Sequence, residues 1–300
     1  MPAKLLSERG LTFERLDKLC EAAEHLSLAR AAKARNTSPE SFSRDIQQLE
    51  EFFGVELIRQ TGRGIELTEF GEQLQAVARE QLQTLSDFKS ACMRRAVNLA
   101  IGAGDSQLQW LILERLPQII QRMPNVTFRL SESFYTSRLR AGTVDLLFTR
   151  QGVVKPPLKT RPLGVMSYSL FIPEKFAPHS ASGGFQPELL SRIPIGILDG
   201  EGQFQDELQR ILKRLNITLD CKIQSFSFPL LARAVKQGVI GAILPNLACR
   251  DFEGTNVKIF SPKFLDSLKR PTVLAWNPRV ARVRPVVEKA VQIFSECCKF

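Results

Sequence analysis

The side chains best suited to chemistry in this sequence are polar residues at helical spacing between residues 39 and 53. Apolar residues recur there at i, i+4, i+7 and i+11, namely Phe42, Ile46, Leu49 and Phe53. Because these positions share one face of a helix, the polar residues fall on the other face. They are Glu40, Ser41, Arg44, Gln47 and Gln48. Such side chains form hydrogen bonds with phosphates and base edges. The pattern indicates either a surface for double-stranded DNA or the solvated face of an ordinary helical hairpin.

Capping residues begin the helices that would position this surface. Ser27 precedes a short alanine-rich segment, residues 28–35, whose small side chains allow close packing. Ser38 and Pro39 then combine a capping hydroxyl with a φ angle suited to the first helical turn. Two helices joined by a three-residue polar turn, with a polar start to the second helix, meet the requirements of a helix-turn-helix that enters a major groove.

Two short extended runs follow in the segment VELIRQTGRGIELT. Arg63 lies between Gly62 and Gly64, which permit a tight turn. An arginine at such a tip either enters a narrow, electronegative minor groove or lies in a solvated turn.

A long helix is predicted over residues 69–94, with Thr68 as its cap. Its apolar stripe consists of Leu74, Ala78, Leu82, Leu85 and Cys92. A stripe of this kind is typical of a helix that packs against another helix.

From Leu11 to about Phe88 the chain resembles the winged helix-turn-helix of LysR-type transcriptional regulators. The matching segments are LARAAKARNTSPESFSRDIQQLEEFFGVELI and RQTGRGIELTEFG, followed by the long helix. The resemblance implies a DNA-binding domain at residues 1–68, a linker helix at 69–94 that pairs two protomers, and an effector-binding domain at 95–300. It implies DNA contacts from Ser38, Ser41, Ser43, Arg44, Gln47 and, in the wing, Arg63.

The start of the recognition helix departs from the family pattern. Family members usually carry Gln-Pro where this chain has Pro39-Glu40. The change removes a glutamine that would contact a base edge, and Glu40 either accepts a hydrogen bond from cytosine or repels phosphate. The operator of a relative therefore does not transfer to this chain.

The last two hundred residues alternate short β-branched runs with helical segments, which favours βαβ units and parallel sheets. The segments IGAGDSQLQWLILERLPQIIQRMPNV, AGTVDLLFTR and RAVKQGVIGAILP resemble the effector domain of the same family. This resemblance implies two α/β lobes of the periplasmic-binding-protein type II kind, with a cleft between them. The whole chain is thus predicted to be α+β.

Candidate effector contacts follow strands or precede helices, because ligands of open parallel sheets lie beyond the C-terminal strand ends. They are Ser106, Gln107, Thr149, Asp199, Ser225 and Ser227. Thr149 and Arg150 stand at the predicted first crossing between the lobes. Ser106 has an alternative role as a helix cap, and the other residues are also compatible with loop structure alone.

Sequence motifs for catalysis and cofactor binding are missing: there is no Walker loop, G-x-S-x-G, H-E-x-x-H or G-x-G-x-x-G. The two histidines, His25 and His179, lie apart, and the six cysteines include no C-x-x-C pair. We therefore expect no enzyme activity, no metal and no cofactor. We interpret the cysteines as buried free thiols, with a redox sensor as the alternative.

Composition and charge restrict the partners. No apolar run approaches the roughly 20 residues that span a bilayer, and the N-terminus lacks the pattern of a secretory signal, so we expect a cytoplasmic protein with no membrane partner. Residues 1–95 hold 14 Lys and Arg against 15 Asp and Glu, whereas residues 96–300 hold 27 against 16. The basic excess of the second part either attracts an anionic effector or is solvated surface.

The sequence predicts a DNA-binding transcriptional regulator that forms a homodimer or homotetramer and responds to a small effector. The alternative is an oligomeric ligand-binding module whose DNA binding is weak or nonspecific, as the near-neutral N-terminal part and Glu40 suggest. An enzyme that uses the cleft would need converging acid, base or metal groups, which the sequence does not show.

Overall fold

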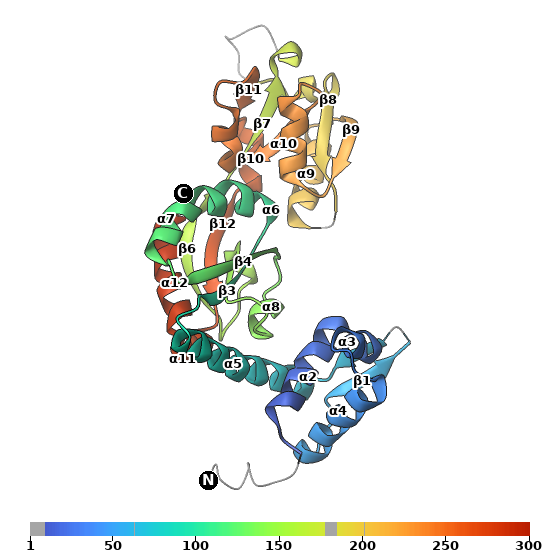
Figure 1. The fold of residues 1–300 in the computed structure, drawn as a ribbon. Helices are drawn as coiled ribbons and strands as arrows, with labels where there is room; N and C mark the ends of the chain where they lie inside the picture. The colour runs from blue at the N-terminus through green and yellow to red at the C-terminus, as the bar shows by residue number, and fades with distance from the viewer. Residues whose placement is uncertain (1–9, 63, 178–184, 201) are drawn as a thin grey trace.

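A computed structural model describes residues 10–62, 64–177, 185–200 and 202–300. A small helical domain lies at one end, a long helix leads away from it, and two sheets with their helices follow (Figure 1). The combination of helices with two mixed sheets confirms the predicted α+β class.

Three capped helices form the N-terminal domain: α2 (Phe13–His25), α3 (Leu28–Ala34) and α4 (Pro39–Phe53). The hydroxyls of Thr12, Ser27 and Ser38 each accept a hydrogen bond from the backbone N–H three residues later, at 3.2, 3.4 and 3.2 Å. These bonds satisfy donors that a helix start leaves unpaired.

The wing is the antiparallel pair β1 (Ile58–Thr61) and β2 (Gly64–Leu67). Its second strand meets the turn between α2 and α3, where Ile65 N donates to Leu26 O at 3.0 Å. Gly64 has φ +143°, and a Cβ there would lie 2.1 Å from Leu26 O. Only glycine therefore fits at this contact.

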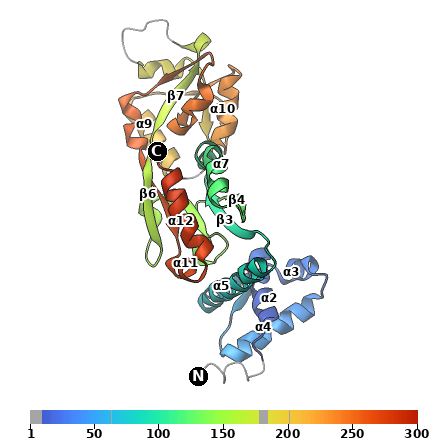
Figure 2. The ribbon, with the colours of Figure 1, turned by 60° about the vertical axis from the view of Figure 1, so that its left-hand side comes forward.

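Helix α5 (Glu69–Cys92) connects the N-terminal domain with the rest of the chain (Figure 2). Its predicted single apolar stripe is divided between two surroundings. Leu74 packs on the core of the helix-turn-helix and Ala78 is buried, whereas Leu85 and Cys92 are exposed. A second set of apolar side chains is also exposed, and with Leu85 it forms what we call the α5 stripe: Phe70, Val77, Leu85 and Phe88.

Lobe I is a five-stranded sheet of order β4-β3-β5-β12-β6 with its helices. Strand β3 pairs in parallel with β4 and β5, while β12 is antiparallel to β5 and β6. Its strands are β3 (Val97–Ala103), β4 (Val126–Glu132), β5 (Leu146–Arg150), β6 (Lys159–Met166) and β12 (Arg270–Trp276). Helices α7 (Leu113–Arg122) and α12 (Pro285–Cys297) pack on a core that includes Leu99 and Phe148.

Lobe II is a second five-stranded sheet, of order β11-β7-β10-β8-β9. Its strands are β7 (Tyr168–Pro173), β8 (Pro194–Leu198), β9 (Asp220–Ser225), β10 (Gly241–Pro245) and β11 (Val257–Phe260). Helix α9 (Gln203–Arg214) contributes to the core on one face, and α10 (Phe228–Lys236) to the core on the other. Trp110 of lobe I is also buried in the α10 core, so the lobes share packing.

Shorter elements complete the chain. They are α6 (Asp105–Gln107), the π-helical η1 (Leu108–Ile112), α8 (Ser137–Arg140), α11 (Pro278–Val283), and the 3-10 turns η2 (Gln151–Val153), η3 (Glu174–Phe176), η4 (Pro187–Ser191), η5 (Asn246–Phe252) and η6 (Lys263–Leu268).

The chain crosses between the lobes at Ser167 and returns through residues 261–269. The prediction that Thr149 and Arg150 stand at the first crossing is therefore wrong, because β6 intervenes as an edge strand of lobe I. The hydroxyls of Ser169 and Ser261 share a hydrogen bond of 2.7 Å beside the crossings.

Candidate functional site

The recognition helix α4 divides into a buried and an open face. Phe42, Ile46 and Leu49 are buried, whereas Arg44 and Gln47 are exposed and Ser41 and Ser43 are half-buried. Phe53 was predicted to lie on the buried face but is 39% exposed, because α4 ends at this residue. The open polar face has the side-chain types that read bases and contact phosphates.

Ser38 is the cap of α4, since its hydroxyl accepts from Ser41 N. The predicted wing contact, Arg63, lies outside the described residues.

An ion-pair network links α4 to α2. Asp45 accepts from Arg15 Nε at 3.2 Å and from Lys18, which is only 7% exposed. The hydrogen bond to Asp45 outweighs burial and raises the pKa of Lys18. Burial acts to raise the pKa of Asp45, but hydrogen bonds from Lys18 and Arg15 lower it below its ordinary value. Both groups thus stay charged, and the ion pair between them fixes the orientation of α4 and its open face.

A second carboxylate joins α4 to the wing. Glu50 Oε1 accepts from Leu57 N at 2.8 Å and from Ile58 N at 3.2 Å. The helix and the start of β1 are therefore fixed relative to each other.

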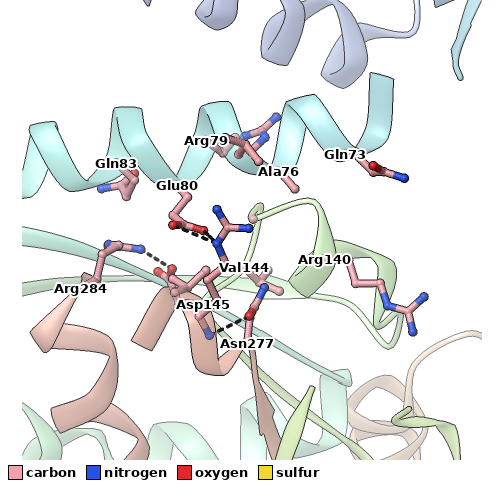
Figure 3. Close-up of a pocket in the computed structure, with 14 residues that line it drawn as sticks. Gln73, Ala76, Arg79, Glu80, Gln83, Arg140, Val144, Asp145, Asn277 and Arg284 are labelled. Atoms are coloured by element: carbon pink, nitrogen blue, oxygen red, sulfur yellow. Dashed lines mark hydrogen bonds and ion pairs between the residues drawn. The ribbon is translucent and has the colours of Figure 1, made fainter. Parts of the chain in front are cut away.

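The junction of α5 with lobe I contains a buried arginine, Arg284, which is 3% exposed. Its guanidinium donates to Asp87 of α5 at 2.6 Å, to Asp145 of lobe I and to Asn98 O at 2.9 Å. Burial raises the pKa of Asp145, and Arg284 opposes this shift. Figure 3 shows Arg284 meeting Asp145 beneath α5.

The same junction encloses a cavity of about 290 Å³ between α5 and lobe I (Figure 3). Glu80 of α5 pairs across it with Arg279 at 2.9 Å. A second cavity, of about 510 Å³, lies between α5 and the helix-turn-helix and is lined by Asp17, Glu21 and Arg35 among others. Neither cavity lies between the two lobes.

The predicted effector residues of lobe I are all buried. Gln107 turns its Oε1 back to accept from Gly104 N at 3.2 Å, which makes it part of a helix cap. Ser106 is 8% and Thr149 is 5% exposed.

The predicted effector residues of lobe II lie at or just after the C-terminal ends of strands β8 and β9. Asp199 is exposed and accepts from Gly200 N at 2.8 Å. Ser225 Oγ accepts from Ser227 N at 3.1 Å, and Ser227 Oγ caps α10 by accepting from Leu230 N at 3.4 Å.

Asp105, which the sequence analysis did not single out, joins the lobes. Its Oδ2 accepts from Phe228 N, the first residue of α10, at 2.9 Å, and its Oδ1 accepts from Ser106 N at 2.5 Å. Burial raises the pKa of Asp105, against the opposing effect of hydrogen bonds from Ser227, Ser106 and Phe228. The sequence signal was its place after the first strand of the lobe, beside Ser106.

Three further contacts cross between the lobes. Trp110 Nε1 donates to Asp251 Oδ2 at 2.9 Å. Arg250 Nη1 donates to Glu114 at 3.3 Å. Arg150 donates to the side chain of Gln203 at the start of α9.

Within the described ranges, no group of three or more histidine, cysteine or acidic side chains is arranged to hold a metal ion. None of the helices described is both long and apolar enough to cross a membrane. Cys20 and Cys298 are buried, whereas Cys92 and Cys221 are exposed. The prediction of buried thiols is therefore wrong for these last two.

Two family models match the chain. "Bacterial regulatory helix-turn-helix protein, lysR family" matches residues 13–72, and "LysR substrate binding domain" matches residues 95–298. The regulator TtuA of Agrobacterium vitis is 35% identical over 147 residues, which cover 47% of this chain and 48% of TtuA. PecT of Dickeya dadantii is 31% identical over 149 residues, covering 47% and 46%. The chain thus spans about half the length of the curated relatives it matches.

Solved structures share the fold along nearly the whole chain. A full-length OxyR variant from Pseudomonas aeruginosa gives a TM-score of 0.67 at 20% identity, covering 97% of this chain and 95% of that one. ArgP from Mycobacterium tuberculosis gives 0.63 at 18% identity, covering 95% and 97%. CbnR in complex with its target DNA gives 0.55 at 19% identity, covering 95% and 100%. With the second family model matching about two thirds of the sequence, the chain belongs to the LysR family of bacterial regulatory helix-turn-helix proteins.

Proposed function

We propose that this protein is a sequence-specific DNA-binding transcriptional regulator whose activity a small effector alters. The observation that carries the proposal is the open polar face of α4. Buried apolar residues pack the other face of this helix against the domain, and the ion pairs of Asp45 link it to α2. Fixed polar side chains on a helix N-terminal half suit major-groove readout, since little ordering is left for binding.

We propose specific roles on that face. Arg44 donates to a guanine or a phosphate, and Gln47 binds an adenine edge. Ser41 and Ser43 contact phosphates, as does Ser38 near the start of the helix, and Arg63 of the wing enters the minor groove. The exposed carboxylate of Glu40 then sets which bases or phosphates approach the helix start.

We propose that the α5 stripe pairs two protomers. Its members Phe70, Val77, Leu85 and Phe88 are 37% to 70% exposed, and their spacing puts them on one face of the helix. A homodimer buries this face and presents two recognition helices to two half-sites. A homotetramer is a further assembly of such dimers.

We propose that the effector acts between the lobes, near Ser106, Gln107 and Thr149 of lobe I and Asp199, Ser225 and Ser227 of lobe II. The bond from Arg284 to Asp87 joins helix α5 to lobe I. A change in the spacing of the lobes therefore changes the position of α5. An effector shifts this equilibrium only by its difference in affinity for the two arrangements.

The proposed divisions of the chain are a DNA-binding domain at 1–68, a linker helix at 69–94 and an effector domain at 95–300. We propose that the protein acts in the cytoplasm, where its DNA partner lies, and that it catalyses no reaction.

A gel-shift assay tests the proposal with DNA from upstream of the protein's own gene and of adjacent genes. We expect binding to at least one fragment that resists excess competitor DNA and weakens steeply with salt as counterions are released. Weak binding that is equal on all fragments would instead favour an oligomeric ligand-binding module.

A further inference from the structure

Two neighbouring strands of lobe I, β3 and β5, end at or near residues of opposite charge, Asp105 and Arg150. Strand β3 pairs in parallel with β5 in the register Ile101 to Leu146 and Gly102 to Leu147. Strand β3 ends at Ala103, and Asp105 follows it as the first residue of α6, while Arg150 is the last residue of β5. Because the two strands are parallel neighbours, both charges lie at the same edge of the sheet. Among the described residues, however, no ion pair within 4.0 Å joins the two charges.

Each charge instead binds a neutral group of lobe II. The Asp105 carboxylate accepts from Phe228 N at the start of α10, and the Arg150 guanidinium donates to Gln203 at the start of α9. Neutral partners compensate the half-buried carboxylate of Asp105 only in part. The bond between Arg150 and Gln203 is exposed, so the guanidinium is open to a ligand. A ligand with both an ammonium and a carboxylate group would offer each side chain an opposite charge.

Three aromatic side chains of lobe II cluster beside the partners of these two charges, Phe228 and Gln203. Tyr168 lies 4.9 Å from Phe204 and 6.0 Å from Phe228, between ring centroids, and Phe204 lies 5.3 Å from Phe228. Burial raises the pKa of Tyr168 to about 12; the positive charges of Arg270 and Arg150 oppose the rise, and the negative charge of Asp105 adds to it. An apolar group bound between the lobes would thus meet rings next to Asp105 and Arg150.

Exposed aromatic residues continue the apolar surface to the rim. Phe134 of lobe I packs against Gly104, where its ring lies 2.4 Å from the position of a Cβ. Phe226 of lobe II is 75% exposed and lies against Gly200. Phe226 lies two residues before Phe228, and Phe134 packs on the glycine that precedes Asp105.

We propose that the interlobe site binds an α-amino acid with an apolar side chain, whose ammonium group pairs with Asp105 and whose carboxylate pairs with Arg150. The inference rests on the proposed function and names the class of its effector. Because these ligand contacts replace the bonds of Asp105 to Phe228 N and of Arg150 to Gln203, binding changes the spacing of the lobes.

Calorimetry with three matched probes tests the proposal on the full-length protein. The probes are L-phenylalanine, 2-phenylethylammonium, which lacks the carboxylate, and 3-phenylpropionate, which lacks the ammonium. We expect L-phenylalanine to bind at least about tenfold more tightly than either single-charge probe, because each charge-assisted contact contributes an order of magnitude.

Two charge-neutralising variants assign the contacts. Asp105→Asn should weaken L-phenylalanine and phenylethylammonium about tenfold without weakening phenylpropionate. Arg150→Gln should show the opposite selectivity, weakening the two carboxylate-bearing probes. Asp206→Asn is the matched control, since this exposed carboxylate of α9 makes no ion pair within the described part of the chain, and it should leave all three affinities unchanged.

The proposal is overturned if L-phenylalanine does not bind, if one single-charge probe binds as tightly, or if Asp105→Asn weakens all three probes equally. Gel shifts on the same preparations separate this result from the proposed function. Intact specific DNA binding with no amino-acid selectivity contradicts only the effector class, whereas loss of specific DNA binding in the unaltered protein contradicts the regulator itself.

Discussion

Arg284 of lobe I and Asp87 of α5 form an ion pair, with Nε 2.6 Å from Oδ2, at a site where the arginine side chain is 3% exposed. The same guanidinium holds Asp145, so one side chain joins the linker helix to the sheet of lobe I. A buried arginine shared by two carboxylates fixes this junction more firmly than a surface pair would.

Replacing the shared arginine should destabilise the effector domain. Arg284→Met leaves Asp145 buried without a cationic partner, and we expect a loss of about 3 kcal/mol in the free energy of unfolding. Urea denaturation followed by circular dichroism measures the change. Arg282→Met, which alters an exposed arginine on α11, is the control and should cost less than about 1 kcal/mol. Equal effects of the two variants would contradict the role of Arg284.

The pH dependence of the stability of Arg284→Met should show that the buried carboxyl of Asp145, left without a cation, causes the loss. Burial raises the pKa of Asp145, and losing Arg284 removes the opposing effect. The folded state then binds a proton more tightly than the unfolded state, so the stability deficit should shrink as the pH falls from 7 towards the raised pKa. A deficit that is constant between pH 7 and pH 5 would show that Asp145 is not its source.

Sequence readout should depend on Arg44. Arg44→Ala should weaken specific DNA binding by about 1 to 3 kcal/mol and relax the preference at one base position if the arginine binds a guanine. Titration of DNA variants by fluorescence anisotropy measures both effects, with Glu51→Ala on the same helix as the control. An equal loss on all DNA sequences would assign Arg44 to a phosphate.

Dimer formation should depend on the α5 stripe. Phe88→Asp puts a charge on the most exposed of its four apolar side chains, and we expect the dimer dissociation constant to rise about 100-fold or more. Sedimentation equilibrium measures the constant. Leu113→Asp changes another exposed apolar residue, on α7, and should leave assembly unchanged. A dimer that survives Phe88→Asp would mean that another surface pairs the protomers.

The thiols should differ in reactivity at pH 8. Burial raises the pKa of Cys20 to about 11 and that of Cys298 to about 12, so both stay protonated and shielded. Cys92 and Cys221 are exposed. Brief treatment with iodoacetamide should therefore alkylate these two first, as peptide mass spectrometry would show. Labelling of Cys298 at the same rate would contradict the burial of its thiol.

Local patterns made much of the N-terminal domain predictable. The predicted caps Ser27 and Ser38 act within four residues of their partners, and the spacing of Phe42, Ile46 and Leu49 fixes a helix face. The pair of Lys18 and Asp45 joins two helices across 27 residues of sequence, so no local pattern predicts it.

The effector domain was harder to predict for the same physical reason. Strand β6 is an exposed edge strand with Pro162 in it, and it lacks the alternation of a half-buried strand. Missing it displaced the predicted lobe crossing to Thr149. Asp105 finds its partner Phe228 N at a separation of 123 residues, which only the tertiary fold reveals.

Selection of genomic DNA fragments by the purified protein, followed by sequencing, tests the central claim most directly. The account predicts that the unaltered protein enriches a small set of fragments with a shared motif, and that Arg44→Ala retains fewer of them or changes one position of the motif. Fragments without a common motif, or an identical motif and yield with Arg44→Ala, would contradict the claim that the open face of α4 reads DNA sequence.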